Sequence, residues 1–155
     1  MEKKYMILIL ACFGFCTTCN KSDDTSGIDY SNIENLYEQP LPVIQKCVEG
    51  KWKWIVMFGD YVGAVYFENT YVEIDTDYII INRDGVQQTI NYKWIRDTFL
   101  TRNLESIDRW VIWDTDQNAG VWFFDSILSD TLSVGHAPLP DGLSSLFRSE
   151  FIRVK

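Results

Sequence analysis

Residues 50–58, Gly-Lys-Trp-Lys-Trp-Ile-Val-Met-Phe, decide the fold because their large apolar side chains recur with a period of two. Every second residue from Trp52 to Phe58 is apolar, and in an extended strand such residues share one face. Lys51 and Lys53 begin the opposite face. The stretch therefore predicts a half-buried β-strand whose inner face carries Trp52, Trp54, Val56 and Phe58.

A second clear strand lies at residues 86–95, where Ile90, Tyr92 and Trp94 alternate with polar residues. The Arg-Asp-Gly sequence at residues 83–85, just before it, has the composition of a tight hairpin turn. The remaining strands are expected at residues 63–68, 71–75, 78–82, 107–113, 120–125, 131–134 and 147–154.

Short gaps separate most of these strands, so we expect neighbours in the sequence to pair antiparallel. Eight or nine such strands predict an all-β fold, an antiparallel up-and-down barrel, because closure removes the exposed edges that hydrophobic strands would otherwise present. Short N-terminal helices are expected ahead of the barrel, at residues 29–39 and 42–48. Pro42 suits the first turn of the second helix, and Gly50 suits its exit.

The N-terminus has the features of an export signal. Lys3 and Lys4 supply a positive start, and residues 6–15 form an apolar run that is too short to span a bilayer. Cys19 follows where a cleavage site is expected. We therefore divide the chain into a signal peptide at residues 1–18, an acidic tether and linker at 19–41, and a barrel domain at 42–155.

Cys19 resembles the lipobox cysteine of bacterial lipoproteins, which becomes the first mature residue and carries acyl chains. Cys12 is preceded by a better lipobox sequence but would leave too short an apolar run. An ordinary secretory signal, cut near Cys19 without lipid, stays open as the alternative. Asp23 and Asp24 resemble the acidic tether of outer-membrane lipoproteins, which implies a cell-envelope location, an outer-membrane anchor and a surface-exposed barrel as one option.

The chain is acidic, with 14 Lys and Arg against 22 Asp and Glu and a net charge of -8. This balance argues against nucleic acid as a partner. Only one of the four cysteines, Cys47, falls in the expected barrel domain, so no disulfide is expected within it. The hydrophobic core, rich in aromatic residues, must therefore stabilise the fold.

A short helix followed by Gly-Lys-Trp at residues 50–52 and a strand meander is similar to the lipocalin and fatty-acid-binding (calycin) superfamily. More narrowly, residues 42–155 resemble the small lipocalin-like lipoproteins of Gram-negative bacteria. The resemblance implies structural roles for Gly50 and Trp52. It places Trp52 at the barrel floor beneath an arginine near the last strand, for which Arg153 is the first choice and Arg148 the second.

Trp54, Tyr92 and Trp94 fall on the expected inner faces of two long strands and are the candidate ligand-binding residues. We expect the barrel to bind a small apolar or amphipathic ligand, although eight strands also leave an interior that side chains alone can fill. The alternative function is a surface module that contacts a glycan or a partner protein through outward aromatic residues. Trp110 and Trp113 are three residues apart and so point to opposite faces of one strand.

Residues 114–120, Asp-Thr-Asp-Gln-Asn-Ala-Gly, resemble a calcium loop with Asp125 at its twelfth position. A polar hairpin turn, with Asn118 or Gly120 at a positive φ, is the favoured interpretation. His136 is the only histidine and is expected in a solvated loop. No nucleophile motif or nucleotide fingerprint occurs, so no catalytic residue, metal or cofactor is assigned. An enzyme would need two carboxylates that converge on one pocket.

Overall fold

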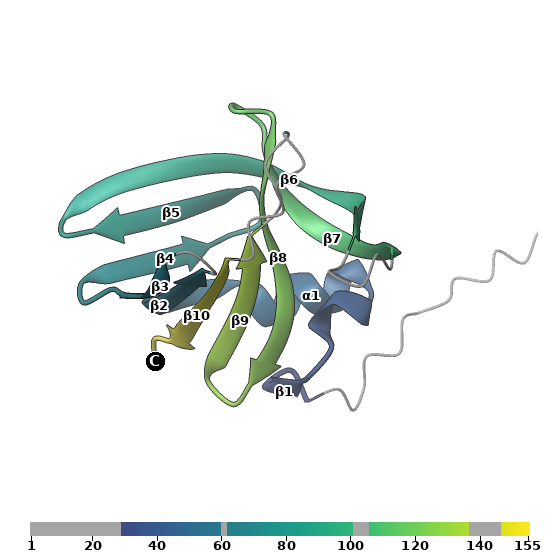
Figure 1. The fold of residues 1–155 in the computed structure, drawn as a ribbon, viewed down its shortest axis with the longest axis horizontal. Helices are drawn as coiled ribbons and strands as arrows, with labels where there is room; N and C mark the ends of the chain where they lie inside the picture. Colours follow the sequence, from purple (N-terminus) through teal and green to yellow (C-terminus); the bar gives the residue numbers. More distant parts are fainter. Residues whose placement is uncertain (1–28, 60–61, 101–105, 137–146) are drawn as a thin grey trace, which may run out of the picture.

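A computed structural model describes residues 29–59, 62–100, 106–136 and 147–155 of the 155-residue chain. Within these residues, eight antiparallel strands close into a β-barrel, which confirms the predicted fold class (Figure 1). The barrel strands are β2 (Gly50–Gly59), β4 (Thr70–Ile74), β5 (Tyr78–Arg83), β6 (Val86–Leu100), β7 (Ser106–Asp114), β8 (Ala119–Leu128), β9 (Thr131–His136) and β10 (Arg148–Arg153).

The first and last barrel strands lie side by side, as expected of a closed meander. β10 pairs with β2 on one side and with β9 on the other, and β8 joins β9 to β7. The longest strand, β6, pairs with β5 along its first part and with β7 along its second part. It curves across the top of Figure 1.

Two short strands lie outside this ring of eight. β3 (Gly63–Tyr66) and β4 both run antiparallel to β2: β4 pairs with Gly50 to Lys53, and β3 pairs with Val56 to Gly59. β3 and β4 therefore lie end to end along β2, and residues 67–69 separate them. The other short strand, β1 (Asn32–Ile33), pairs with β8.

The prediction of a helix at residues 29–39 is wrong. β1 lies in this stretch, followed by a single 3-10 turn, η1 (Leu36–Glu38), whose Leu36 is fully buried. Isolated helices of this length are marginal in water. Pairing of the backbone with β8 and burial of Leu36 therefore outweigh the local helical pattern.

The second expected helix is confirmed as α1 (Leu41–Val48), which begins one residue earlier than predicted and carries Pro42 in its first turn. Its apolar face joins the barrel core through Val43, Ile44, Cys47 and Val48. α1 therefore covers the barrel at the end where β2 begins. No helix in the described ranges is long and apolar enough to cross a membrane.

The two faces of β2 exchange at a β-bulge in its pairing with β10. Trp54 pairs with Phe151, but the next pair is Val56 with Glu150, so one residue of β2 lies between them without a partner. An extra residue turns the following side chains to the other face. The prediction that Val56 and Phe58 continue the inner face of Trp54 therefore fails for Phe58, which is 40% exposed, whereas Val56 is buried at 3% exposed but lies outside the main core cluster.

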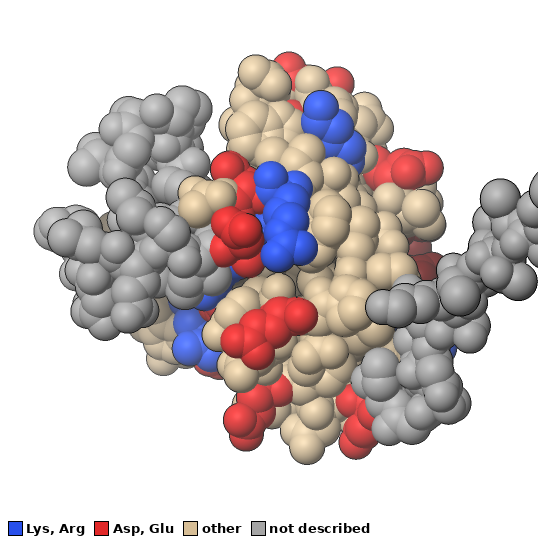
Figure 2. Space-filling model, turned by 90° about the vertical axis from the view of Figure 1, so that its right-hand side faces the viewer, with Lys and Arg blue, Asp and Glu red and all other residues tan. Residues whose placement is uncertain are grey.

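The centre of the barrel is filled with side chains. Trp52, Phe124 and Phe151 are the largest fully buried side chains, and they belong to one cluster with the apolar face of α1. On the face in Figure 2, acidic side chains are scattered among uncharged ones with a few basic neighbours, in keeping with the net charge of -8.

Candidate functional site

A cleft of about 450 Å³ lies between α1 and the barrel end that this helix covers. Its walls come from α1, from the end of β4 with the turn that follows it, and from β6. The residues that shape its chemistry are Lys46, Glu49, Ile74, Asp75, Tyr92 and Trp94.

Two of the three predicted ligand-binding residues, Tyr92 and Trp94, lie together in this cleft. Their ring centroids are 5.9 Å apart and their planes are nearly perpendicular, at 81°. Trp94 also packs against Phe124 of the core, with ring centroids 5.7 Å apart. The packed core therefore holds the indole from one side and leaves the cleft on the other.

The polar atoms of this pair are unequally satisfied. The Tyr92 hydroxyl donates a hydrogen bond to the Asp75 carbonyl, and burial raises the pKa of Tyr92 to about 12, so the hydroxyl stays neutral. Trp94 Nε1 is buried and completes no hydrogen bond within the described residues. It still lies near the Tyr92 hydroxyl, and this contact offsets a part of the rise in the pKa of Tyr92. The Tyr92 oxygen can still accept a hydrogen bond.

Charged side chains surround the mouth of the cleft. Lys46 places its Nζ 4.3 Å from the centroid of the Tyr30 ring. The Asp75 carboxylate accepts hydrogen bonds from the Thr76 backbone and the Tyr78 hydroxyl, and these lower the pKa of Asp75. Apolar walls with a few polar groups are typical of small-molecule sites.

The barrel floor next to the cleft is built around Trp52. Its indole N–H donates to the Val48 carbonyl at 2.7 Å. The Arg153 guanidinium lies 4.2 Å from the indole centroid and donates to the carbonyls of Cys47 and Glu49, at 2.6 and 3.2 Å. These contacts join the end of α1 to the first and last strands.

Gly50 lies at the same junction, with a φ of 126° that side chains rarely adopt. A Cβ at this position would lie 3.2 Å from Nη1 of Arg153. The other candidate arginine, Arg148, instead donates to the Ser133 hydroxyl at 2.8 Å on the outer wall.

The third predicted ligand-binding residue, Trp54, lies away from the cleft. It packs in a second aromatic cluster, with ring centroids 4.5 Å from Phe67, 5.1 Å from Phe151 and 5.9 Å from Trp122. Its buried Nε1 has no hydrogen-bond partner among the described residues. The structure therefore separates Trp54 from Tyr92 and Trp94.

His136 belongs to this second cluster, and the prediction of a solvated loop residue is wrong. It is the last residue of β9, its Nε2 lies 2.9 Å from the Ser149 hydroxyl, and Ser149 is fully buried. Burial lowers the pKa of His136 to about 4. Leu132, Val134 and His136 are every second residue of this strand, so the sequence pattern could have placed His136 on the inner face of the barrel.

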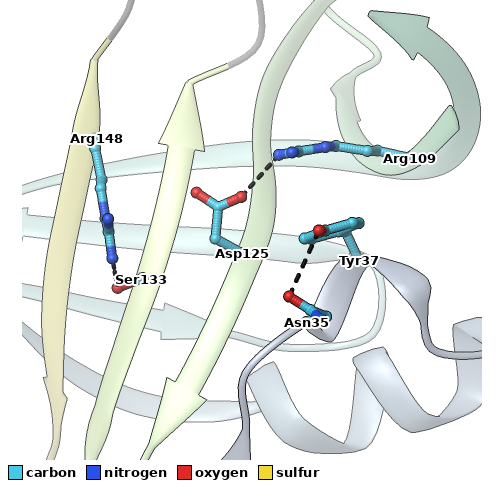
Figure 3. A network of polar contacts seen from close by, with 6 residues as sticks. All are labelled: Asn35, Tyr37, Arg109, Asp125, Ser133 and Arg148. Atoms are coloured by element: carbon cyan, nitrogen blue, oxygen red, sulfur yellow. Dashed lines mark hydrogen bonds and ion pairs between the residues drawn. The ribbon is translucent and has the colours of Figure 1, made fainter. Parts of the chain in front are cut away.

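The outer wall carries a polar network that the sequence pattern does not predict (Figure 3). Arg109 forms an ion pair with Asp125 at 2.7 Å, and its guanidinium lies 4.3 Å from the Tyr37 ring and 4.4 Å from the Phe123 ring. Burial raises the pKa of Asp125, against the opposing charges of Arg109 and Arg148. The network attaches η1 to the wall formed by β7 and β8.

The calcium-like stretch is a hairpin turn between β7 and β8, as favoured from the sequence. Asn118 has a φ of 52°, and Asp114 Oδ1 accepts hydrogen bonds from the backbone N–H groups of Asp116 and Gln117. Asp125, the twelfth position of the loop, is bound to Arg109 instead. In the described ranges no three His, Cys, Asp or Glu side chains are placed to hold a metal ion.

The aromatic residues that are exposed differ from those expected. All six Trp are described, and each is buried or only partly exposed. Trp113 points outward and donates from Nε1 to Asn118, whereas Trp110 packs against the core. Among the residues that the structure describes, the exposed large aromatic residues are Phe58, Tyr66 and Tyr71.

Cys19 and the expected signal peptide lie outside the described residues. Comparison of the chain with protein-family models, curated proteins and solved structures found no significant match.

Proposed function

We propose that this protein is an exported cell-envelope lipoprotein whose lipocalin-like barrel binds a small apolar or amphipathic molecule in the cleft beneath α1. The observation that carries this proposal is the cleft of about 450 Å³ that Tyr92 and Trp94 line. Its size lies within the range of about 300–1,000 Å³ that is typical of small-molecule sites.

The packed barrel centre limits what this cleft can accept. Trp52, Phe124 and Phe151 fill the space beneath it, so a long chain cannot run along the barrel axis. A ligand must fit between α1 and β6, with its apolar part against Ile74 and Trp94. This favours a compact amphiphile.

A fluorescence assay tests the proposal with N-phenyl-1-naphthylamine, a neutral dye that brightens in apolar sites. Gln45→Trp adds an indole to the cleft wall on α1, and Gln87→Trp makes the same change at an exposed position of β6. We expect saturable dye binding by the wild type and by Gln87→Trp, and its loss in Gln45→Trp. Equal binding by both variants, with unchanged melting temperatures, would contradict the cleft as the site.

A second candidate function is the surface module. Tyr66 of β3 is 73% exposed and shares a strand face with Ala64, which pairs with the exposed Phe58 of β2. Exposed apolar residues that adjoin one another are typical of interaction sites. If Tyr66→Ser abolishes binding of a glycan from an array while dye binding persists, this second function is favoured.

A further inference from the structure

We propose that the cleft beneath α1 selects a neutral amphiphile with a hydroxyl head group and rejects the carboxylate of a fatty acid. The inference rests on the function proposed above and adds the chemical class of the ligand. Two independent features carry it: the hydrogen-bonding atoms of Tyr92 and Trp94, and the charges around the mouth.

The two aromatic residues offer one donor and one acceptor. Trp94 Nε1 is buried and completes no hydrogen bond within the described residues. The Tyr92 hydroxyl already donates to the Asp75 carbonyl, so its oxygen can only accept, and the Trp94 N–H approaches that oxygen without completing a hydrogen bond. A ligand hydroxyl can accept from Trp94 and donate to Tyr92, whereas a carboxylate can only accept.

The charges around the cleft disfavour an anion. Among the described residues that line the cleft, Glu49 and Asp75 are acidic and Lys46 is the basic one, with its Nζ over the Tyr30 ring. Burial is the main cause of the raised pKa of Tyr92, and the charges of Asp77, Asp75 and Glu49 add to it. These three carboxylates therefore contribute a negative potential at the Tyr92 hydroxyl.

Arg153 does not offset this potential for a ligand. It is not among the residues that line the cleft, and its guanidinium is engaged by the carbonyls of Cys47 and Glu49. A carboxylate head group that enters the cleft would lose hydration and meet like charges, whereas a hydroxyl loses little.

Calorimetric titration of the purified protein with octanol and with octanoate compares two head groups on one apolar chain. We expect octanol to bind at least about ten-fold more tightly, which corresponds to about 1.4 kcal/mol. If octanoate binds as tightly as octanol or more tightly, the inference is overturned and the proposed function stands. If neither ligand binds and the dye also fails to bind, both are overturned.

Matched variants separate the two features. Glu49→Gln removes a carboxylate from the mouth, and Glu68→Gln removes the same charge at an exposed position between β3 and β4 that does not line the cleft. We expect Glu49→Gln alone to tighten octanoate binding by about two- to five-fold. Trp94→Phe keeps an aromatic ring but lacks the N–H, and we expect it to weaken octanol binding. Wild-type affinities in both Glu49→Gln and Trp94→Phe would overturn the inference.

Discussion

The guanidinium of Arg153 lies 4.2 Å from the centroid of the Trp52 indole and joins the last barrel strand to the first. The same guanidinium binds two backbone carbonyls at the end of α1, and the indole N–H binds a third. This pair therefore links the end of α1 to the β2–β10 seam that closes the barrel. Because α1 forms one wall of the cleft, this pair also shapes the proposed binding site.

Substitution of Trp52 should destabilise the protein more than substitution of Arg153. Trp52 is fully buried, so Trp52→Ala should lower the free energy of unfolding by about 3–5 kcal/mol. Arg153→Ala removes a cation–π contact and two hydrogen bonds, for a loss of about 1–3 kcal/mol. Urea unfolding measures both values. A Trp52→Ala variant with the wild-type midpoint would contradict the burial of this residue.

His136 should make the protein less stable in mild acid. Its folded pKa of about 4 lies below the usual value of 6.5, so the unfolded chain takes up the proton first as the pH falls. The stability linked to His136 is complete above pH 6.5 and is lost as the pH falls towards 4. Between pH 7 and pH 4.5 we expect a loss of about 2 kcal/mol from this group.

Comparison with His136→Gln isolates this effect, because Asp125 and Asp75 titrate in both proteins. Denaturant unfolding at several pH values should give a steeper loss of stability for the wild type than for His136→Gln. Parallel curves for the two proteins would show that His136 is not held neutral in the fold.

Replacing only one partner of the Arg109–Asp125 ion pair should lower the stability of the protein. Their side chains are 15% and 28% exposed, so either single alanine variant leaves a partly buried charge without its partner. We expect each to cost about 2–3 kcal/mol, below the value for fully buried pairs. The double variant should cost less than the sum of the two. Additive losses in a double-mutant cycle would argue against the pair.

Cys19 should carry the lipid anchor if the N-terminal signal is that of a lipoprotein. Cells that express the full chain and are fed an alkyne-labelled fatty acid should label the wild-type protein but not Cys19→Ser. Cys12→Ser serves as the matched control and should label normally. Equal labelling of wild type and Cys19→Ser would exclude this cysteine as the acylation site.

The barrel could be predicted from the sequence because alternating apolar residues mark its strands. The β2 bulge could not, because the pattern of Trp54 and Val56 is the same with or without an extra residue. Only the pairing of Val56 with Glu150 reveals that the faces exchange. The exposure of Phe58 could not be predicted for the same reason, because it follows from the pairing of β2 with β10 and not from the spacing of apolar residues.

The site could be predicted in part. The period of β6 places Tyr92 and Trp94 on one inner face, but nothing local to β6 shows that α1 lies opposite them. Arg109 and Asp125 lie on neighbouring strands of one hairpin, but the register that brings them together includes a bulge between Ile112 and Trp113 that the sequence pattern does not reveal. Contacts that depend on tertiary packing leave no periodic pattern in the chain.

The nuclear magnetic resonance signal of the Trp94 indole N–H tests the proposed binding site most directly. Trp94→Phe assigns this signal by its loss, and the outward Trp113, which donates to Asn118, serves as an internal control. Titration with N-phenyl-1-naphthylamine should shift the Trp94 signal saturably and leave the Trp113 signal in place. A Trp94 signal that stays unchanged while the dye saturates the protein would contradict ligand binding in the cleft beneath α1.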